Sequence, residues 1–124
     1  MTKQEKQLLL KDLCARLPYH VRVKVWLKDK TTEEGFFDFE HNYGDVLMDF
    51  FFYNKLKDLK PYLRPMSSMT DEECVEYNII KCSICPDEPD DYAGFVDWLI
   101  SHHFDYSGLI PMGLALEAPE GMYK

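Results

Sequence analysis

Residues 20–28 read HVRVKVWLK and alternate between apolar and polar side chains, with only Trp26 departing from the polar set. Because successive side chains of a strand point to opposite faces of a sheet, this alternation places the three valines and Leu27 on one face. It is the clearest strand pattern in the chain. It therefore predicts a sheet with one buried face, against which the other elements pack.

Two further segments of strand character follow, at residues 35–40 and 46–53. The first is expected to turn Phe37 and Phe39 inward. Because short polar turns separate these segments, the three strands are predicted to form an antiparallel meander. Residues 54–69 leave two alternatives open, a further strand with a loop or a series of short turns, since two prolines prevent a long helix there.

Two capping-box patterns, at residues 2–5 and 70–73, mark helix starts. In each pattern a threonine hydroxyl accepts from the amide of the glutamate three residues later, and that glutamate reaches back to the threonine amide. The patterns predict helices over residues 3–17 and 71–80. Apolar residues at helical spacing predict a third helix over residues 90–103.

Apolar residues in the irregular C-terminal segment are expected to dock it on the domain body, namely Leu109, Ile110, Leu114 and Leu116. The sequence thus predicts a single α+β domain over residues 1–124. Its parts are a small antiparallel sheet of three or four strands, an N-terminal helix, two later helices and an irregular docked C-terminal tail.

The net charge of −8 is unevenly distributed along the 124 residues. Residues 1–64 hold 12 basic and 10 acidic side chains, whereas residues 65–124 hold 2 basic and 12 acidic ones. An acidic surface steers basic partners and keeps a protein in solution, and it disfavours nucleic acid as a partner. We expect the interaction surface to comprise Asp71, Glu72, Glu73, Glu76, Asp87, Glu88, Asp90 and Asp91.

A zinc site is an alternative interpretation of the residues in the second half of the chain. Cys82 and Cys85 form a CxxC pair, whose spacing lets two thiolates bind one Zn²⁺. His102 or His103 is a candidate third ligand and Cys74 a candidate fourth. The competing interpretation is that these are ordinary reduced thiols.

The stretch SHHFDYSG at residues 101–108 also suggests an acid–base site. His102, His103, Asp105 and Tyr106 lie close together in sequence, and histidine is the usual general base near neutral pH. No serine elbow, phosphate-binding loop or zinc-protease motif accompanies them. A helix end packed against the core explains the same residues without catalysis.

The polar face of residues 20–28 suggests a nucleic-acid surface. Arg22, Lys24, Trp26 and Lys28 interleave basic groups with an aromatic ring, which suits phosphates and stacked bases. The alternative is a solvated strand face, on which basic side chains also discourage edge pairing.

The sequence contains no apolar run long enough to span a membrane and no signal-peptide core. It has four cysteines and no secretion signal, which is typical of a cytoplasmic protein with reduced thiols.

Three stretches resemble a known group of proteins: MTKQEKQLLLKDLCARLPY at residues 1–19, KPYLRPMSSMTDEE at 60–73 and DWLISHHFDYSGLIPMGLALEAPEGMY at 97–123. The group is a family of small uncharacterised proteins, frequent in gut anaerobic bacteria and in their phages and mobile elements. The resemblance implies an intracellular accessory protein, and it supplies no activity, catalytic residue or cofactor.

The sequence as a whole favours a non-enzymatic cytoplasmic protein that binds an unidentified protein partner through its acidic C-terminal half. The alternatives are a small metal-binding or enzymatic domain centred on His102, His103 and Asp105, and a nucleic-acid binder that uses the basic strand face. No cofactor is expected, and zinc is the alternative.

Overall fold

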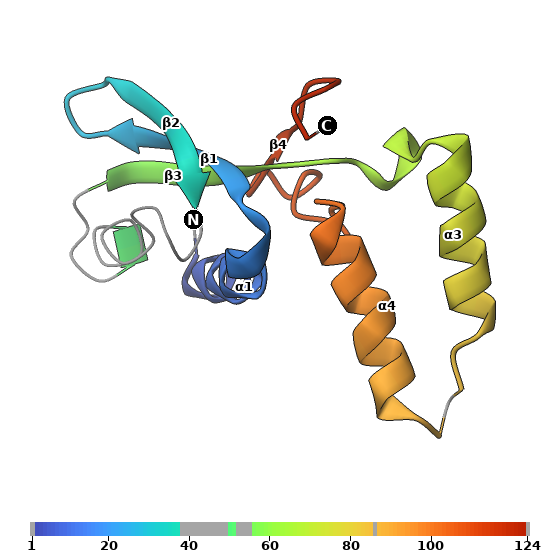
Figure 1. Cartoon of the computed structure of the whole chain (residues 1–124). Coiled ribbons are helices and arrows are strands. Elements are labelled where there is room, and N and C mark those ends of the chain that lie inside the picture. Colours follow the sequence, from blue (N-terminus) through green and yellow to red (C-terminus); the bar gives the residue numbers. More distant parts are fainter. Residues whose placement is uncertain (1, 38–49, 52–55, 86, 124) are drawn as a thin grey trace.

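The structure is a computed structural model that describes residues 2–37, 50–51, 56–85 and 87–123. In chain order its elements are α1 (Lys3–Ala15), the 3₁₀ helix η1 (Leu17–Tyr19), β1 (Val21–Leu27), β2 (Thr32–Phe37), β3 (Leu56–Leu63), the 3₁₀ helix η3 (Met66–Ser68), α3 (Asp71–Cys82), α4 (Pro89–Ser101) and β4 (Leu116–Glu117). Figure 1 shows these elements as an α+β arrangement, which confirms the predicted fold class.

The sheet has the strand order β2-β1-β3-β4. β1 pairs antiparallel with both β2 and β3, and the short strand β4 adds a parallel edge to β3. The predicted meander of residues 20–28, 35–40 and 46–53 placed β1 at an edge, and this is wrong, because β1 pairs on its other side with β3, which follows the predicted third strand. The central position suits β1, since the valines of its inner face are all buried.

The structure describes part of the region that follows β2. Residues 54–69 contain a strand, β3, followed by a 3₁₀ turn, as one of the two alternatives required. Of the strand predicted over residues 46–53, only Phe50 and Phe51 are described, and their backbone is π-helical rather than extended. The remainder of that predicted strand lies outside the described residues, as does Phe39.

Both capping boxes are present, and they start α1 and α3 where predicted. α1 ends two residues before the predicted boundary, because Arg16 caps it and η1 follows. α4 likewise ends before the predicted boundary, at Ser101.

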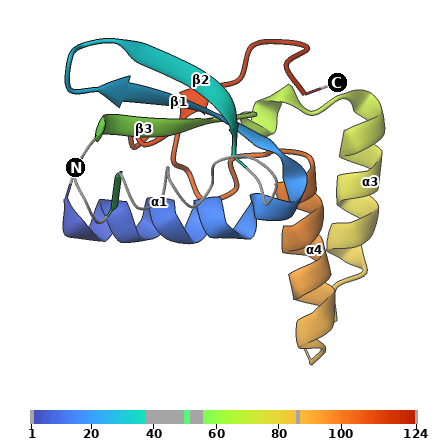
Figure 2. The same cartoon turned by 60° about the vertical axis from the view of Figure 1, so that its left-hand side comes forward.

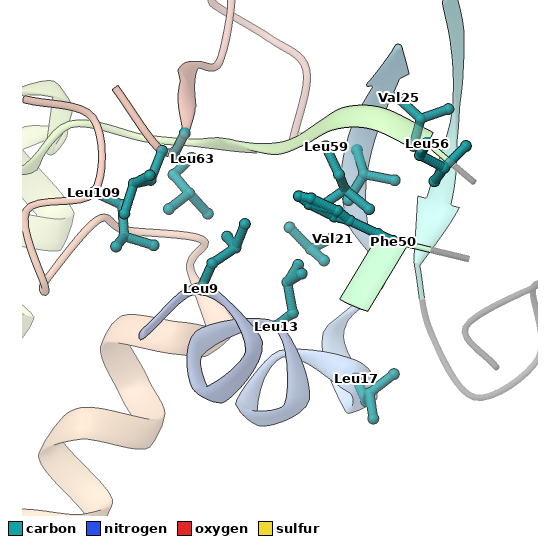
Figure 3. Packing of buried hydrophobic residues seen from close by; sticks show 13 residues of the cluster. Leu9, Leu13, Leu17, Val21, Val25, Phe50, Leu56, Leu59, Leu63 and Leu109 are labelled. Atoms are coloured by element: carbon teal, nitrogen blue, oxygen red, sulfur yellow. The ribbon is translucent and has the colours of Figure 1, made fainter. Parts of the chain in front are cut away.

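The core lies between α1 and one face of the sheet. Leu9 and Leu13 are fully buried and point from α1 toward the sheet, as Figure 3 shows. The C-terminal tail docks as predicted, since Leu109 and Leu114 are buried in the same cluster and Ile110 packs against it. The core residues are Leu9, Leu13, Leu17, Val21, Val23, Val25, Phe50, Leu56, Leu59, Leu63, Leu109, Leu114 and Ala115.

A buried ion pair links α1 to the tail. Arg16 is fully buried, and its Nε donates to Oδ2 of Asp12 over 2.7 Å. Its Nη2 donates to the carbonyl oxygen of Phe104 over 2.7 Å. Burial raises the pKa of the Asp12 carboxyl, although the Arg16 guanidinium acts in the opposite direction. The pair thus holds two distant segments together in a site with little water.

α3 and α4 form a helical hairpin that extends away from the sheet and from α1. Figures 1 and 2 both show the two helices side by side, with their connection at the end farthest from the sheet. α3 contains no buried residue. The two helices of the hairpin therefore bury little surface against each other. The hairpin is attached to the body at its base, the end nearest the sheet.

We predict that Asp12→Asn lowers the free energy of unfolding by about 3 kcal/mol, because it leaves the buried Arg16 charge unpaired. Urea unfolding at neutral pH measures this loss. Lys11→Gln, on the exposed side of the same helix, is the control and should change stability little. A loss below about 1 kcal/mol in the Asp12 variant would show that the pair is not structurally important.

Candidate functional site

The stretch SHHFDYSG forms a helix C-terminus. His103 has a left-handed backbone with φ of 64°. Its amide donates to the carbonyl of Ile100 over 2.9 Å, and the amide of Phe104 donates to that of Leu99 over 3.0 Å. These two bonds make a Schellman motif, which satisfies the last carbonyls of α4 and turns the chain toward the sheet.

The two histidine rings have different partners. The His102 ring lies 4.3 Å from the Trp98 ring between centroids, and its Nδ1 is 2.8 Å from the Trp98 carbonyl oxygen. The His103 ring stacks on Tyr123 of the tail, with the ring centroids 3.8 Å apart. Burial, followed by the charges of Arg16 and Arg64, lowers the pKa of His103 to about 4. A histidine in this setting stays neutral at physiological pH.

Asp105 and Tyr106 also have structural roles. The Asp105 carboxylate is buried and accepts from the amides of Leu109 and Ile110 over 2.8 and 2.9 Å. The Arg16 guanidinium lies over the Tyr106 ring at 5.7 Å. The candidate acid–base residues therefore hold the helix end and the tail in place, each through its own contacts.

The hydroxyl of Tyr123 forms hydrogen bonds to two strands of the sheet. It accepts from the Arg22 amide over 2.9 Å and donates to the Tyr62 carbonyl over 2.6 Å. It thereby bridges β1 and β3, and burial raises its pKa to about 12. Tyr123 was not singled out from the sequence, because nothing local to a tail residue shows that it inserts between two strands.

The structure does not bring the candidate zinc ligands together. All four cysteines are free and exposed. Cys82 and Cys85 lie where α3 leads into α4, whereas His102 and His103 follow the other end of α4, a helix of 13 residues and about 20 Å. Within the described ranges, no group of three or more His, Cys, Asp or Glu side chains is arranged to hold a metal ion.

Arg64 attaches the hairpin to the sheet. Its two terminal nitrogens donate to the Glu73 carboxylate over 2.6 and 2.8 Å, and its guanidinium lies 4.3 Å from the Phe104 ring centroid. The pairing with Arg64 and the capping bonds with Thr70 lower the pKa of Glu73 to about 2. Glu73 was predicted to be part of the interaction surface. It is instead partly buried and bound internally.

The other predicted acidic residues are exposed on the hairpin and its connection. Asp97 was not among the acidic residues predicted to form the interaction surface, and it is exposed on α4 as well. Residues 71–101 hold nine of the 22 acidic side chains and one of the 14 basic ones, so they carry the whole net charge of −8. The remaining 13 acidic and 13 basic residues balance.

The hairpin also exposes apolar side chains. The exposed fractions are 59% for Val75, 61% for Ile79 and 62% for Tyr92. Between the helices, the Tyr77 ring contacts Phe95 and Trp98, with centroids 5.5 and 6.2 Å apart. The hairpin is thus the most acidic part of the molecule and, among the described residues, it carries the large apolar side chains with the highest exposed fractions.

The side chains of the basic strand face lie where the sequence predicted them. Arg22, Lys24 and Trp26 lie on the sheet face opposite the buried valines, and Lys28 follows the end of β1 and is exposed. The ammonium groups of Lys24 and Lys60 lie 5.5 and 5.7 Å from the Trp26 ring centroid. Lys60 reaches this face from β3, a pairing that the sequence alone does not show.

Comparison with family models, curated proteins and solved structures gives no match for this chain. Within the described residues, none of the helices combines the length and the apolar character that a membrane crossing requires.

We predict an acid-sensitive stability that depends on His103. Because the pKa of His103 is about 4 in the folded chain against 6.5 as its ordinary value, the folded state binds this proton more weakly than the unfolded state. The contribution is complete above the ordinary value and is lost as the pH falls toward about 4. After allowance for solvent screening, the loss should be about 1–2 kcal/mol.

Urea unfolding as a function of pH tests this prediction with His103→Asn, since asparagine also tolerates a left-handed backbone. This variant should lose the acid-dependent component. His20→Asn is a matched control, because His20 is exposed and has φ of 53°. Equal pH profiles for the wild type and His103→Asn would contradict the prediction.

Proposed function

We propose that the chain is a non-enzymatic accessory protein that binds a partner protein through the α3–α4 hairpin. One observation carries this proposal: the element with all the net charge also exposes Val75, Ile79 and Tyr92. A hairpin that served only to keep the protein in solution requires the acidic residues and not the apolar ones. Protein interfaces combine apolar centres with charged rims.

The attachment of the hairpin supports the same function. Arg64 and Glu73 fix the base of α3, so the rest of the hairpin extends from the body with both helices accessible. An element held at one end presents a large surface to a partner without disturbing the core.

We further propose an intracellular setting on a phage or another mobile element. The four free thiols support a reducing compartment. The mobile-element setting is supported by the sequence resemblance of residues 1–19, 60–73 and 97–123.

We predict that a tagged chain retains a specific partner from lysate of the organism that carries the gene, identified by mass spectrometry. Asp87→Asn, Asp90→Asn and Asp91→Asn together should weaken retention at low salt, and Val75→Ser with Ile79→Ser should abolish it at any salt. The matched control neutralises three exposed acids outside the hairpin, Glu33, Glu117 and Glu120, and should retain the partner.

Circular dichroism of each variant confirms that the helices are kept. A partner that all variants retain equally would contradict the proposed surface, and the reproducible absence of any partner would contradict the function.

A second candidate function is nucleic-acid binding by the basic strand face, favoured by the ammonium groups of Lys24 and Lys60 that lie near the Trp26 ring. The net charge of −8 opposes it. Our leading proposal predicts that the chain passes through a heparin column unretained at low salt. Retention that Lys24→Ala and Lys60→Ala remove would instead support the second candidate.

A further inference from the structure

A groove lies along the α3–α4 hairpin. It has a volume of about 510 Å³, and its apolar lining comes from both helices, with Ile79, Ile80, Gly94, Phe95 and Trp98. Asp90, Asp91 and Asp97 border it along α4. The groove thus combines apolar and acidic lining residues, and it reaches Ser101 at the end of α4, next to His102.

Gly94 is unexplained by the packing of the chain itself. It lies in the interior of α4, where glycine is less favourable than alanine. Among the residues that the structure describes, none has an atom within 4 Å of a Cβ built at this position, so no described contact requires the glycine. It does keep the groove open at that point, where the backbone of another chain can approach closely.

We infer that this groove binds an amphipathic, basic α-helix of the partner protein; this inference rests on the proposed function. Two packed helices present a groove between their side-chain ridges, and a third helix fits such a groove with its apolar stripe inward. Binding buries the exposed Ile79 side chain and the remaining exposed parts of the Phe95 and Trp98 rings, which are already partly buried. It completes a three-helix core, which two short helices cannot form alone.

The charge of the hairpin selects the occupant. Eight exposed acidic side chains and a single lysine lie on residues 71–101. A second copy of the same hairpin brings the same charge and is repelled, whereas a helix with lysines or arginines beside its apolar stripe complements Asp90 and Asp91.

The test uses two designed peptides of about 18 residues with identical leucine and lysine content. In one, the leucines recur at helical spacing and form a single stripe; in the other, leucine and lysine alternate as in a strand. Labelled peptides are titrated with the full-length protein and binding is followed by fluorescence anisotropy, at low and at moderate salt.

Two protein variants separate groove shape from helix stability. Gly94→Ala adds a methyl group to the groove lining and should raise the melting temperature by a few degrees while weakening the helical peptide by about tenfold. Ala93→Gly is the opposite control, since Ala93 is exposed on the same helix and lies outside the groove lining. It should lower the melting temperature and leave binding unchanged.

The inference is supported if the helical peptide binds, the alternating peptide binds at least about tenfold more weakly, and Gly94→Ala reduces binding. Equal binding of the two peptides, an unchanged affinity in Gly94→Ala, or no binding of the helical peptide overturns it. The proposed function is judged separately by the lysate experiment. A partner that depends on Val75 and Ile79 but is indifferent to Gly94→Ala refutes the helix-in-groove inference and leaves the proposed function intact.

Discussion

Phe104 is the residue through which the parts of this fold are joined. Its carbonyl accepts from Arg16 of the α1 cap, its amide closes the Schellman motif of α4, and Arg64 at the end of β3 lies over its ring. Phe104 itself is fully buried. Each of the two arginines is neutralised by a carboxylate from a helix, Asp12 in α1 and Glu73 in α3. The sheet, the N-terminal helix and the hairpin therefore meet at one aromatic residue between two ion pairs.

This junction anchors one end of the hairpin to the body. The ion pair of Arg64 reaches the first turn of α3, and the Schellman motif fixes the last turn of α4. Both anchors lie at the same end. Beyond them the helices contact one another through Tyr77, Phe95 and Trp98. A charge-balanced body thus carries an acidic extension, and among the described residues the Tyr19 hydroxyl of η1 also holds it, donating to Asp97 of α4 over 2.6 Å.

Local sequence signals predicted the parts of the fold that local physics decides. The alternation in residues 20–28 identified β1, and the threonine–glutamate pairs located the starts of α1 and α3 to the residue. The strand order could not be predicted in this way, because pairing of β1 with β3 joins residues far apart in sequence. The helix end at His103 was equally hidden, since left-handed caps are normally signalled by glycine or asparagine and not by histidine.

The sequence predicted the charge of the candidate surface but not its geometry. The sequence located the acids of the hairpin, yet it could not show that Glu73 turns inward to Arg64, because that contact depends on where β3 ends. Nor could it separate the exposed Val75 and Ile79 from core residues, since a helix that packs on a partner has the same apolar period as one that packs on its own domain.

The exposed apolar side chains of α3 bear on the stability of this helix. A helix of 12 residues is marginal in water, and most helices in proteins are stabilised by the burial of an apolar face. α3 has a capping box and an ion pair at its first turn but no buried side chain along its length. Its described contacts lie at the N-terminal end and, through Glu76 and Tyr77, in the middle of the helix, and Ile79 and Ile80 of the groove follow them. If a partner helix binds in the groove as we propose, it buries Ile79 and Ile80 beyond the contacts that α3 makes within the chain, so binding and the ordering of α3 are expected to be thermodynamically coupled.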